Sequence, residues 1–166
     1  ATVVAMSDSN GYVVDENGID FRIIQQIKEQ KRERISTYPN YVPTAKYVEG
    51  CAGIWSVPCD IAMPCATQNE IDTDSAKLLV SNGCKAVFEG SNMPCTPEAI
   101  QAIKASGLLY SPSKASNAGG VAVSGLEMSQ NSERLYWTFE AVDAKLKEIM
   151  ENILSLIHIS EPTRHA

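Results

Sequence analysis

Histidine is almost absent from this chain of 166 residues. Its two histidines, His158 and His165, both lie at the very end. The body of the chain therefore offers no Ser–His or Cys–His pair for nucleophilic catalysis and no histidine for a metal site. We expect neither a catalytic residue of that kind nor a bound metal ion in this sequence.

The chain also has no long apolar run and little clustered positive charge. No stretch approaches the roughly 20 apolar residues of a membrane helix. The first residues, ATVVAMSDS, lack the basic and apolar regions of a signal peptide. The net charge of −6 argues against a surface for nucleic acids or anionic membranes. The one basic stretch, 28–34, is by default the solvated face of a helix.

The five cysteines, at positions 51, 59, 65, 84 and 95, form no CxxC pair. An odd number without that spacing makes a zinc finger or a disulfide framework a weak interpretation, so we expect free thiols in a reducing cytoplasm. Cys65 follows a strand-like run, but without a nearby histidine we expect a small buried residue there. An initiator methionine is absent too, and we expect the true start to lie upstream.

What the chain does contain is an alternation of strand-like and helical patterns. Strand-like runs occupy 1–6, 45–50, 59–66, 85–90 and 108–112, with turns at Asn10-Gly11 and Asn17-Gly18. Capping residues and apolar spacing predict helices from Asp20, with Phe21, Ile24 and Ile27 in one stripe, from Asp72 or Thr73 to Asn82, from Thr96 to Gly107, and over about 117–131 and 138–154. This alternation predicts an α/β fold whose parallel sheet is covered on both faces.

Four loops follow the expected strands and are rich in small polar residues: 7–11, 64–70, 89–96 and 112–120. Open α/β sheets bind ligands at the carboxyl ends of their strands. We therefore expect the four loops to converge on one nucleotide-type site. Glu89, in the third loop, is expected to be solvated or to cap a helix.

Individual loop residues leave alternatives open. In a dinucleotide-binding fold the second strand ends in an acid that binds the adenosine ribose, and Asp8 holds that place if 1–6 is the second strand. Asp8, Ser9 and Asn10 are equally good turn formers. The stretches 66–69 (ATQN) and 91–94 (SNMP) offer backbone groups, hydroxyls and amides that can hold a ribose or a carboxamide, but no general base.

Several stretches together resemble the hexameric glutamate dehydrogenases: SDSNGYVVDENGID, KYVEG, CDIAMPCATQNEID, NGCKAVFEGSNMP and SPSKASNAGGVAVSGLEMSQNSERLYWTFEAVDAKL. The resemblance runs from residue 1 to about 154. It implies a Rossmann-like, doubly wound and mostly parallel sheet that is incomplete at its N-terminus and is followed by C-terminal helices. It divides the chain into a partial dinucleotide-binding domain (1–135), the start of a helical return (136–154) and a non-native tail (155–166).

The resemblance implies reversible, NAD(P)-dependent oxidative deamination of L-glutamate to 2-oxoglutarate and ammonia. Carried over, the loop residues that contact the cofactor are Ala66, Thr67, Gln68, Asn69, Asn92 and Asn117. Val121 and Ser124 are similar to the positions that contact the glutamate side chain and its distal carboxylate. Gly119 and Gly120 let the helix start approach cofactor and substrate, although tight helix packing is the structural alternative. The NAGG stretch (117–120) differs from the related leucine, phenylalanine and valine dehydrogenases.

Cofactor choice depends on the first loop. Asp8 alone favours NAD, because an acid accepts hydrogen bonds from the ribose hydroxyls and repels a 2′-phosphate. Ser9 and the basic helix at Lys28, Lys31 and Arg32 can offset that repulsion. The SDS stretch (7–9) is similar to NADP-linked members, so NADP is the expected cofactor and NAD the alternative.

The resemblance also indicates what to expect outside this sequence. The phosphate-binding glycine turn, the substrate domain with its catalytic Lys and Asp, and the last helices are not encoded here, so the polypeptide alone is expected to be inactive. The family implies a cytoplasmic homo-hexamer active in nitrogen assimilation. Two alternatives are a non-catalytic nucleotide-binding module and a dehydrogenase for another amino acid. Residues 155–166 look like a translated sequencing adapter, with a native extension as the alternative.

Overall fold

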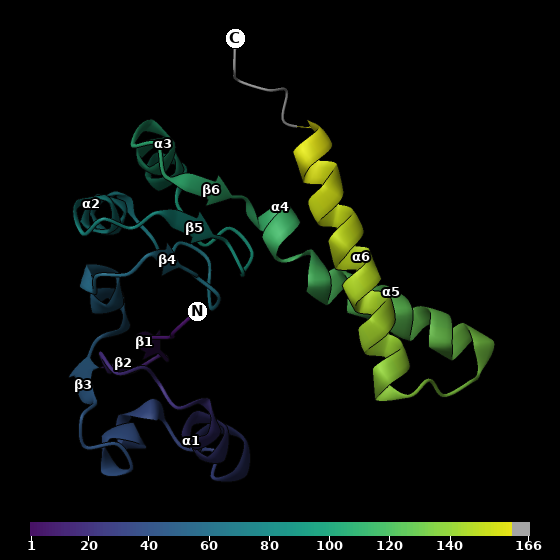
Figure 1. Ribbon diagram of the computed structural model, residues 1–166, viewed down its shortest axis with the longest axis horizontal. Coiled ribbons are helices and arrows are strands. Elements are labelled where there is room, and N and C mark those ends of the chain that lie inside the picture. The colour runs from purple at the N-terminus through teal and green to yellow at the C-terminus, as the bar shows by residue number, and fades with distance from the viewer. Residues whose placement is uncertain (161–166) are drawn as a thin grey trace.

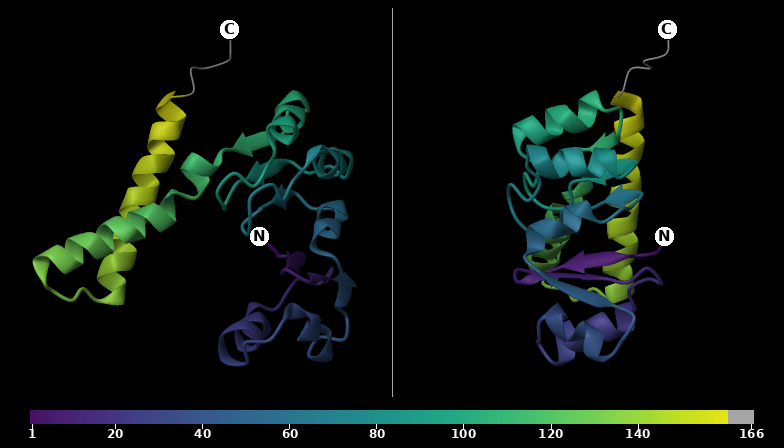
Figure 2. Two further views of the ribbon diagram at one scale, coloured as in Figure 1. Left: turned by 180° about the vertical axis from the view of Figure 1, so that it is seen from behind. Right: turned by 90° about the vertical axis from the view of Figure 1, so that its left-hand side faces the viewer.

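The computed structural model describes residues 1–160, and 161–166 lie outside the described part. Two three-stranded sheets form the body of the molecule. The first contains β1 (Ala5–Ser7), β2 (Gly11–Val14) and β3 (Lys46–Glu49); the second contains β4 (Ile61–Ala62), β5 (Ala86–Phe88) and β6 (Leu109–Ser111). The two sheets lie next to each other, with β1 nearest to β4 (Figures 1 and 2). The expected α/β fold class is observed.

The second sheet is parallel, as the alternation of patterns predicts, with Ala62 opposite Val87 and Val87 opposite Tyr110. The crossover helices α2 (Thr73–Ser81) and α3 (Pro97–Ala105) pack side by side along it (Figure 1). Asp72 caps α2 by accepting from the backbone N–H of Ser75 at 2.8 Å, and Thr96 caps α3 in the same way. Both helix starts are therefore where the sequence predicts them.

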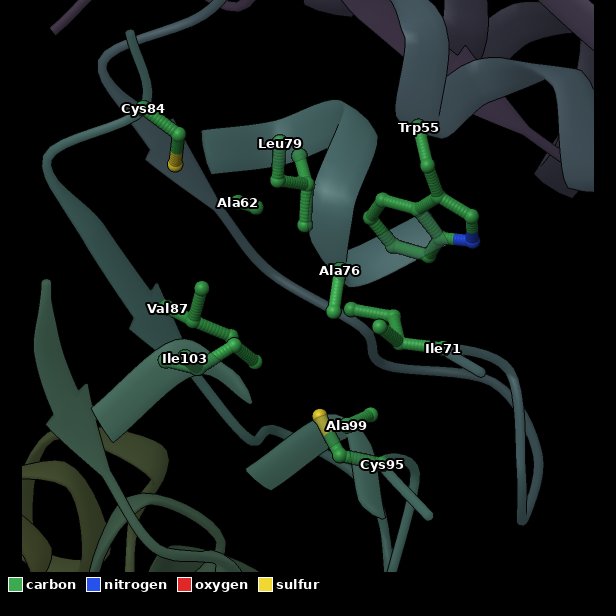
Figure 3. Packing of buried hydrophobic residues seen from close by; sticks show 10 residues of the cluster. All are labelled: Trp55, Ala62, Ile71, Ala76, Leu79, Cys84, Val87, Cys95, Ala99 and Ile103. Carbon is green, nitrogen blue, oxygen red and sulfur yellow. The ribbon is translucent and has the colours of Figure 1, made fainter. Parts of the chain in front are cut away.

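A core of small and branched side chains fills the space between this sheet and its two helices (Figure 3). Val87 from β5, Leu79 from α2 and Ile103 from α3 are almost completely buried. Trp55, in the 3-10 helix η3 (Cys51–Ser56), closes the core on the side of the first sheet. Ile61 and Met63 stay exposed, so within this chain the helices do not cover both faces of the parallel sheet as predicted.

The first sheet is antiparallel throughout, which the prediction of one parallel sheet did not anticipate. The connection between β1 and β2 contains only residues 8–10, and a connection this short can join antiparallel strands but cannot cross over to a parallel one. Gly11 follows the turn, and a Cβ there would lie 2.2 Å from the carbonyl oxygen of Val48. The close approach of β2 and β3 therefore requires glycine at that position.

Helical turns pack on one side of the antiparallel sheet. They are α1 (Phe21–Gln25), the π-helical turn η1 (Gln26–Gln30) and the 3-10 helix η2 (Ile35–Asn40). Ile24 and Ile27 are buried with Val13 of β2, as their spacing predicts, and Ile35 is buried with them. Phe21 is 68% exposed, so its assignment to the apolar stripe is wrong. It stands at the first position of α1, before the helix turns toward the sheet.

Three helices follow β6: α4 (Ser113–Ser116), α5 (Ala118–Glu133) and α6 (Phe139–Ser160). The last two pack against each other and project from the sheets as an arm (Figures 1 and 2). No residue of α5 is buried. Helix α6 continues past the expected end at 154 and includes 155–160, the first half of the stretch expected to be a non-native tail. No described helix is both long and apolar enough to cross a membrane.

Candidate functional site

Three of the four predicted loops meet at the carboxyl ends of β4, β5 and β6. The backbone N–H groups of Gly90 and Ser91 both donate to the carbonyl oxygen of Pro64, at 3.0 and 3.1 Å. The Ser91 hydroxyl donates to the Thr67 carbonyl at 3.3 Å, and the Asn69 N–H donates to that of Met93 at 3.1 Å. These hydrogen bonds therefore join the loops after β4 (64–70) and β5 (89–96) into one rim at the edge of the sheet.

Asn117 attaches the third loop to this rim. It ends α4 and immediately precedes α5, and its side chain makes no capping hydrogen bond to α5. Instead, its Nδ2 donates to the carbonyl oxygen of Ser91 at 3.2 Å. The amide at the start of α5 thus spans two loops, which places it at the centre of the expected site.

Glu89 supports the rim from beneath and is buried, with 2% of its surface exposed. The expectation of a solvated glutamate is therefore wrong, whereas the helix-capping alternative fits, because the carboxylate accepts from the first N–H group of α4. Its Oε1 accepts from the Cys95 N–H at 3.3 Å and its Oε2 accepts from the Ser113 N–H at 2.8 Å. Burial, together with this carboxylate, raises the pKa values of the Cys95 thiol and the Tyr110 phenol. One carboxylate thus joins the loop after β5 to the start of α4.

Gly90 brings the rim into close contact with the loop after β4. A Cβ at Gly90 would lie 2.5 Å from the sulfur of Cys65, closer than such atoms approach in proteins. Cys65 itself is exposed, so the expectation of a small buried residue is wrong. Partial burial still raises the pKa of its thiol, and so does the charge of Glu70. A raised pKa leaves little thiolate at neutral pH.

Most of the predicted cofactor residues lie exposed along this rim. They are Ala66, Thr67, Gln68, Asn69 and Asn92. The Ala66 N–H donates to the Glu70 carboxylate at 2.9 Å, which fixes the start of the loop. Asn69 adopts the left-handed conformation, with φ 57°. Their side chains are accessible, whereas the backbone beneath them is held in place.

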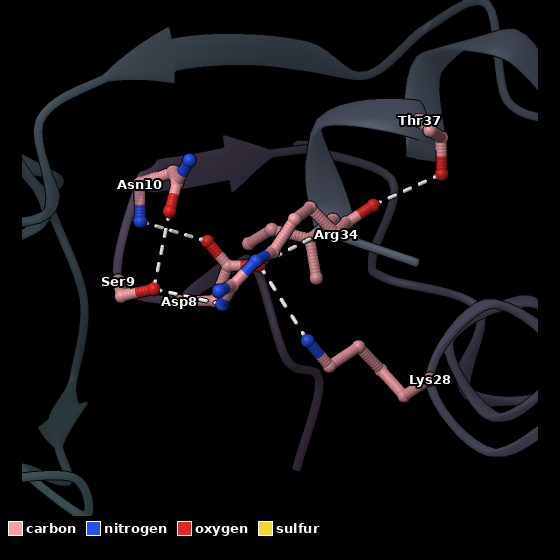
Figure 4. A network of polar contacts seen from close by, with 7 residues as sticks. Asp8, Ser9, Asn10, Lys28, Arg34 and Thr37 are labelled. Carbon is pink, nitrogen blue, oxygen red and sulfur yellow. Dashed lines mark hydrogen bonds and ion pairs between the residues drawn. The ribbon is translucent and has the colours of Figure 1, made fainter. Parts of the chain in front are cut away.

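The first loop is organised separately (Figure 4). The Asp8 Oδ1 accepts from the Asn10 N–H at 3.0 Å, and its Oδ2 accepts from the Ile35 N–H at 3.0 Å and lies 3.5 Å from the Lys28 Nζ. Arg34 donates to the Ser9 hydroxyl at 2.7 Å. No hydrogen bond or ion pair within 1–160 ties residues 8 and 9 to the other three loops, so direct contacts join three of the four loops, and the place of the first loop in the site stays a prediction.

The electrostatics of the first loop favour a charged Asp8. Burial alone would raise the pKa of Asp8, but the N–H groups of Asn10 and Ile35 and the Lys28 ammonium lower it below its usual 3.8. Within 1–160, Lys28 pairs with Asp8, whereas Lys31 donates to the Tyr41 hydroxyl instead. Arg34 was not predicted from the sequence to contact this loop. It stands in the same basic stretch, and only the fold shows that it reaches Ser9.

At the start of α5 there is free space beside Gly120. A Cβ at Gly120 would meet no other atom within 4 Å, and one at Gly119 would meet only the Met150 sulfur, at an ordinary 3.6 Å. Tight packing inside the chain therefore does not explain glycine at Gly120. Val121 is 76% exposed, and the Ser124 hydroxyl donates to the Gly120 carbonyl at 3.2 Å. These two residues lie three apart, on one side of the helix.

Known proteins resemble this chain over nearly its whole length. The family model of Glutamate/Leucine/Phenylalanine/Valine dehydrogenases matches residues 1–161. The chain belongs to this family. The NADP-specific glutamate dehydrogenase of Helicobacter pylori is 49% identical over 159 residues, which are 92% of this chain and 36% of that protein. The NAD(P)-specific glutamate dehydrogenase of Xylanibacter ruminicola is 54% identical over 156 residues, 92% of this chain and 35% of the relative.

A solved structure of the family shows the same arrangement. The crystal structure of Plasmodium falciparum glutamate dehydrogenase superposes with a TM-score of 0.85 at 52% identity, covering 93% of this chain and 33% of that one. The chain thus spans about a third of the length of the relatives it matches. The exposed hydroxyls and amides of the rim and the free space at Gly120 suit a polar ligand bound by directional hydrogen bonds.

Proposed function

We propose that this chain is the cofactor-binding part of an NADP-dependent glutamate dehydrogenase. The observation that carries the proposal is the hydrogen-bonded rim at the ends of β4, β5 and β6, with Asn117 joined to Ser91 at its centre. Thr67, Gln68 and Asn69 would lie along the nicotinamide ribose, with Ala66 beside them and Asn92 at the nicotinamide. The bound nicotinamide would accept or supply the hydride.

The residues of the rim contribute position rather than proton transfer. Their amides and hydroxyls donate and accept directional hydrogen bonds but have no pKa suited to acid–base catalysis near neutral pH. Glu89 is buried with both carboxylate oxygens occupied, so it is held away from the ligand. We therefore assign no catalytic residue to this chain, and we place the proton-transferring groups in the remainder of the enzyme.

The substrate proposed for the whole enzyme is L-glutamate, or 2-oxoglutarate in the reverse direction. Val121 and Ser124 are the substrate contacts within this chain, and the Ser124 hydroxyl is suited to a distal carboxylate that apolar amino acids lack. Gly120 leaves space beside them for the ligand. The names of the relatives in Helicobacter pylori and Xylanibacter ruminicola support this substrate.

The charges around the first loop favour NADP over NAD. The Asp8 carboxylate already accepts two backbone hydrogen bonds and lies beside Lys28, so it is a poorer acceptor for ribose hydroxyls than a free acid. Lys28 and Arg34 approach the loop from one side, where Lys28 pairs with Asp8 and Arg34 donates to the Ser9 hydroxyl (Figure 4). Two cations and a hydroxyl are suited to a 2′-phosphate.

The organisation of the whole protein is part of the proposal. Residues 1–135 form most of the dinucleotide-binding domain, and 136–154 begin the return toward a substrate domain. The full-length enzyme is a homo-hexamer in the cytoplasm, and this chain alone does not turn over glutamate, because half of the reacting assembly is elsewhere. NADPH formation from glutamate by the purified chain would contradict that last point.

The test is the cofactor preference of the full-length enzyme. The ratio of kcat/KM for NADPH and NADH is measured for wild type, Lys28→Ala and Arg34→Ala, with Lys77→Ala as a matched control because Lys77 is an exposed lysine on α2. Each of the first two variants removes a charge-assisted hydrogen bond to the phosphate. The ratio of kcat/KM for NADPH to that for NADH should therefore fall about tenfold in each. Lys77→Ala should leave the ratio unchanged.

The outcomes separate the parts of the proposal. A ratio that Lys28→Ala and Arg34→Ala leave unchanged would remove the phosphate contact but not the dehydrogenase. An enzyme that binds NADPH and has no activity on glutamate would favour the nucleotide-binding module. Greater activity on leucine or phenylalanine than on glutamate would favour a dehydrogenase for another amino acid.

A further inference from the structure

Two cysteines lie opposite each other at the start of the parallel ladder between β4 and β5. The register pairs Ile61 with Ala86, so counting back two positions on each strand places Cys59 opposite Cys84. The intermediate pair confirms this extension, because the carbonyl oxygen of Asp60 accepts from the Lys85 N–H at 2.8 Å and the two side chains form an ion pair at 2.6 Å.

The spacing of the two positions suits a disulfide. Facing positions on neighbouring strands are about 4.8 Å apart, and disulfides join residues whose Cα atoms are roughly 4.4 to 6.8 Å apart. Neither cysteine lies inside a regular strand, since β4 begins at Ile61 and β5 begins at Ala86. The backbone on both sides is therefore less constrained than it would be in the middle of a sheet.

The two thiols lie in the same part of the core. Cys84 is buried, and its sulfur lies 3.3 Å from the carbonyl oxygen of Ala86 and 3.7 Å from that of Asp60. Cys59 is half-buried and packs against the same core. Burial raises the pKa of Cys59 to about 11, and the adjacent Cys84 thiol and the Asp60 carboxylate raise it as well.

We propose that Cys59 and Cys84 form a thiol pair that closes to a disulfide on reaction with a small disulfide such as oxidised glutathione. The Cys59 thiolate attacks one sulfur of the small disulfide, which forms a mixed disulfide and releases one small thiolate. The Cys84 thiolate then attacks the Cys59 sulfur and releases the second. The two protons lost by the cysteines end on the two small thiols, and the small disulfide is reduced as the protein is oxidised.

This site is separate from the rim, which lies at the other ends of the same strands. The two exposed cysteines, Cys51 and Cys65, do not take part. Closing the pair ties the beginnings of β4 and β5 together, so it should stabilise the folded chain by restricting the unfolded one.

The test uses the Cys51→Ser/Cys65→Ser variant, because trypsin leaves Cys51, Cys59 and Cys65 together in peptide 47–77 and Cys84 in peptide 78–85. The folded variant is treated with oxidised glutathione at mildly alkaline pH, where more of the Cys59 thiol is ionised, then alkylated and digested. We expect peptide 47–77 linked to peptide 78–85, and a urea midpoint that rises on oxidation. Additional Cys59→Ser or Cys84→Ser changes should abolish both results.

Three outcomes would overturn the proposal. A glutathione adduct that persists on Cys59 would mean that Cys84 is out of reach. Linkage to the peptide that contains Cys95 would mean that Cys59 does not lie opposite Cys84 in the folded chain. Linkage that forms only in urea would mean that the folded chain does not bring the two sulfurs together.

Discussion

The two sheets hold their candidate binding loops by different means. At the parallel sheet, backbone hydrogen bonds and the carboxylates of buried Glu89 and of Glu70 fix the rim. At the antiparallel sheet, the loop at Asp8 is held by two cations, Lys28 and Arg34, which contact the Asp8 carboxylate and the Ser9 hydroxyl. A rim held mainly by main-chain groups should depend less on pH and salt than a loop held by charged side chains.

The largest effect should come from removing the negative charge of Glu89. In Glu89→Gln, one carboxylate oxygen becomes an NH2 group that faces a backbone N–H, which leaves a buried donor without an acceptor. We expect a loss of about 3 kcal/mol in the free energy of unfolding, measured by urea titration. Glu127→Gln, on the exposed side of α5, is the matched control and should change little. Equal losses of unfolding free energy in the two variants would show that Glu89 does not support the rim.

A smaller loss is expected where the rim depends on close contact. Gly90→Ala places a Cβ against the Cys65 sulfur, and overpacking of this kind costs about 1–3 kcal/mol. Cys65→Ala removes the sulfur, so the double variant should recover most of the loss. Non-additivity in this double-mutant cycle is the measurement.

Gly120→Ala serves as the control for that cycle. Its Cβ would meet nothing within 4 Å, so the change should stabilise α5 by about 1 kcal/mol or less. In the full-length enzyme the same variant should bind its ligands more weakly. A destabilised Gly120→Ala chain would show that an unrecognised packing contact explains this glycine.

The smallest of these effects should appear only in acid and only in the antiparallel half. The pKa of Asp8 is lower in the folded chain than its usual 3.8, so its stabilising contribution is complete above that value. The contribution is lost as the pH falls through the lower, folded-state pKa. Between about pH 5 and pH 3, wild type should therefore lose more stability than Asp8→Asn, as measured by urea unfolding at each pH. Parallel pH profiles for the two proteins would contradict this account of the loop.

Local signals in the sequence predicted the elements of the fold well. Asp72 and Thr96 cap the helices they were expected to cap, because capping depends only on residues within one turn. Gly107 adopts the left-handed conformation expected after α3. The three βα loops of the parallel sheet converge for the same reason, since parallel strands end at one edge.

What the sequence did not predict depends on partners far along the chain. Glu89 looked like a surface residue because its two hydrogen-bond donors, at Cys95 and Ser113, are identified only once β5 and β6 are paired. The antiparallel hairpin was missed because 11–14 was not among the predicted strands, so residues 8–10 were not recognised as its connection. Arg34 was missed because its neighbour Ser9 is 25 residues away in sequence.

The positions of the two tryptophans offer independent signals from the body of the molecule and from its helical arm. Trp55 is enclosed in the core beside the parallel sheet, with its indole N–H donating to the Glu70 carbonyl at 3.0 Å. Trp137 lies in the segment that connects α5 to α6, with the Lys145 ammonium 5.1 Å from the centre of its ring. Because α5 buries none of its residues, fluorescence from the second indole should change at lower urea than fluorescence from the first. Single-tryptophan proteins would then distinguish loosening of the arm from melting of the sheets.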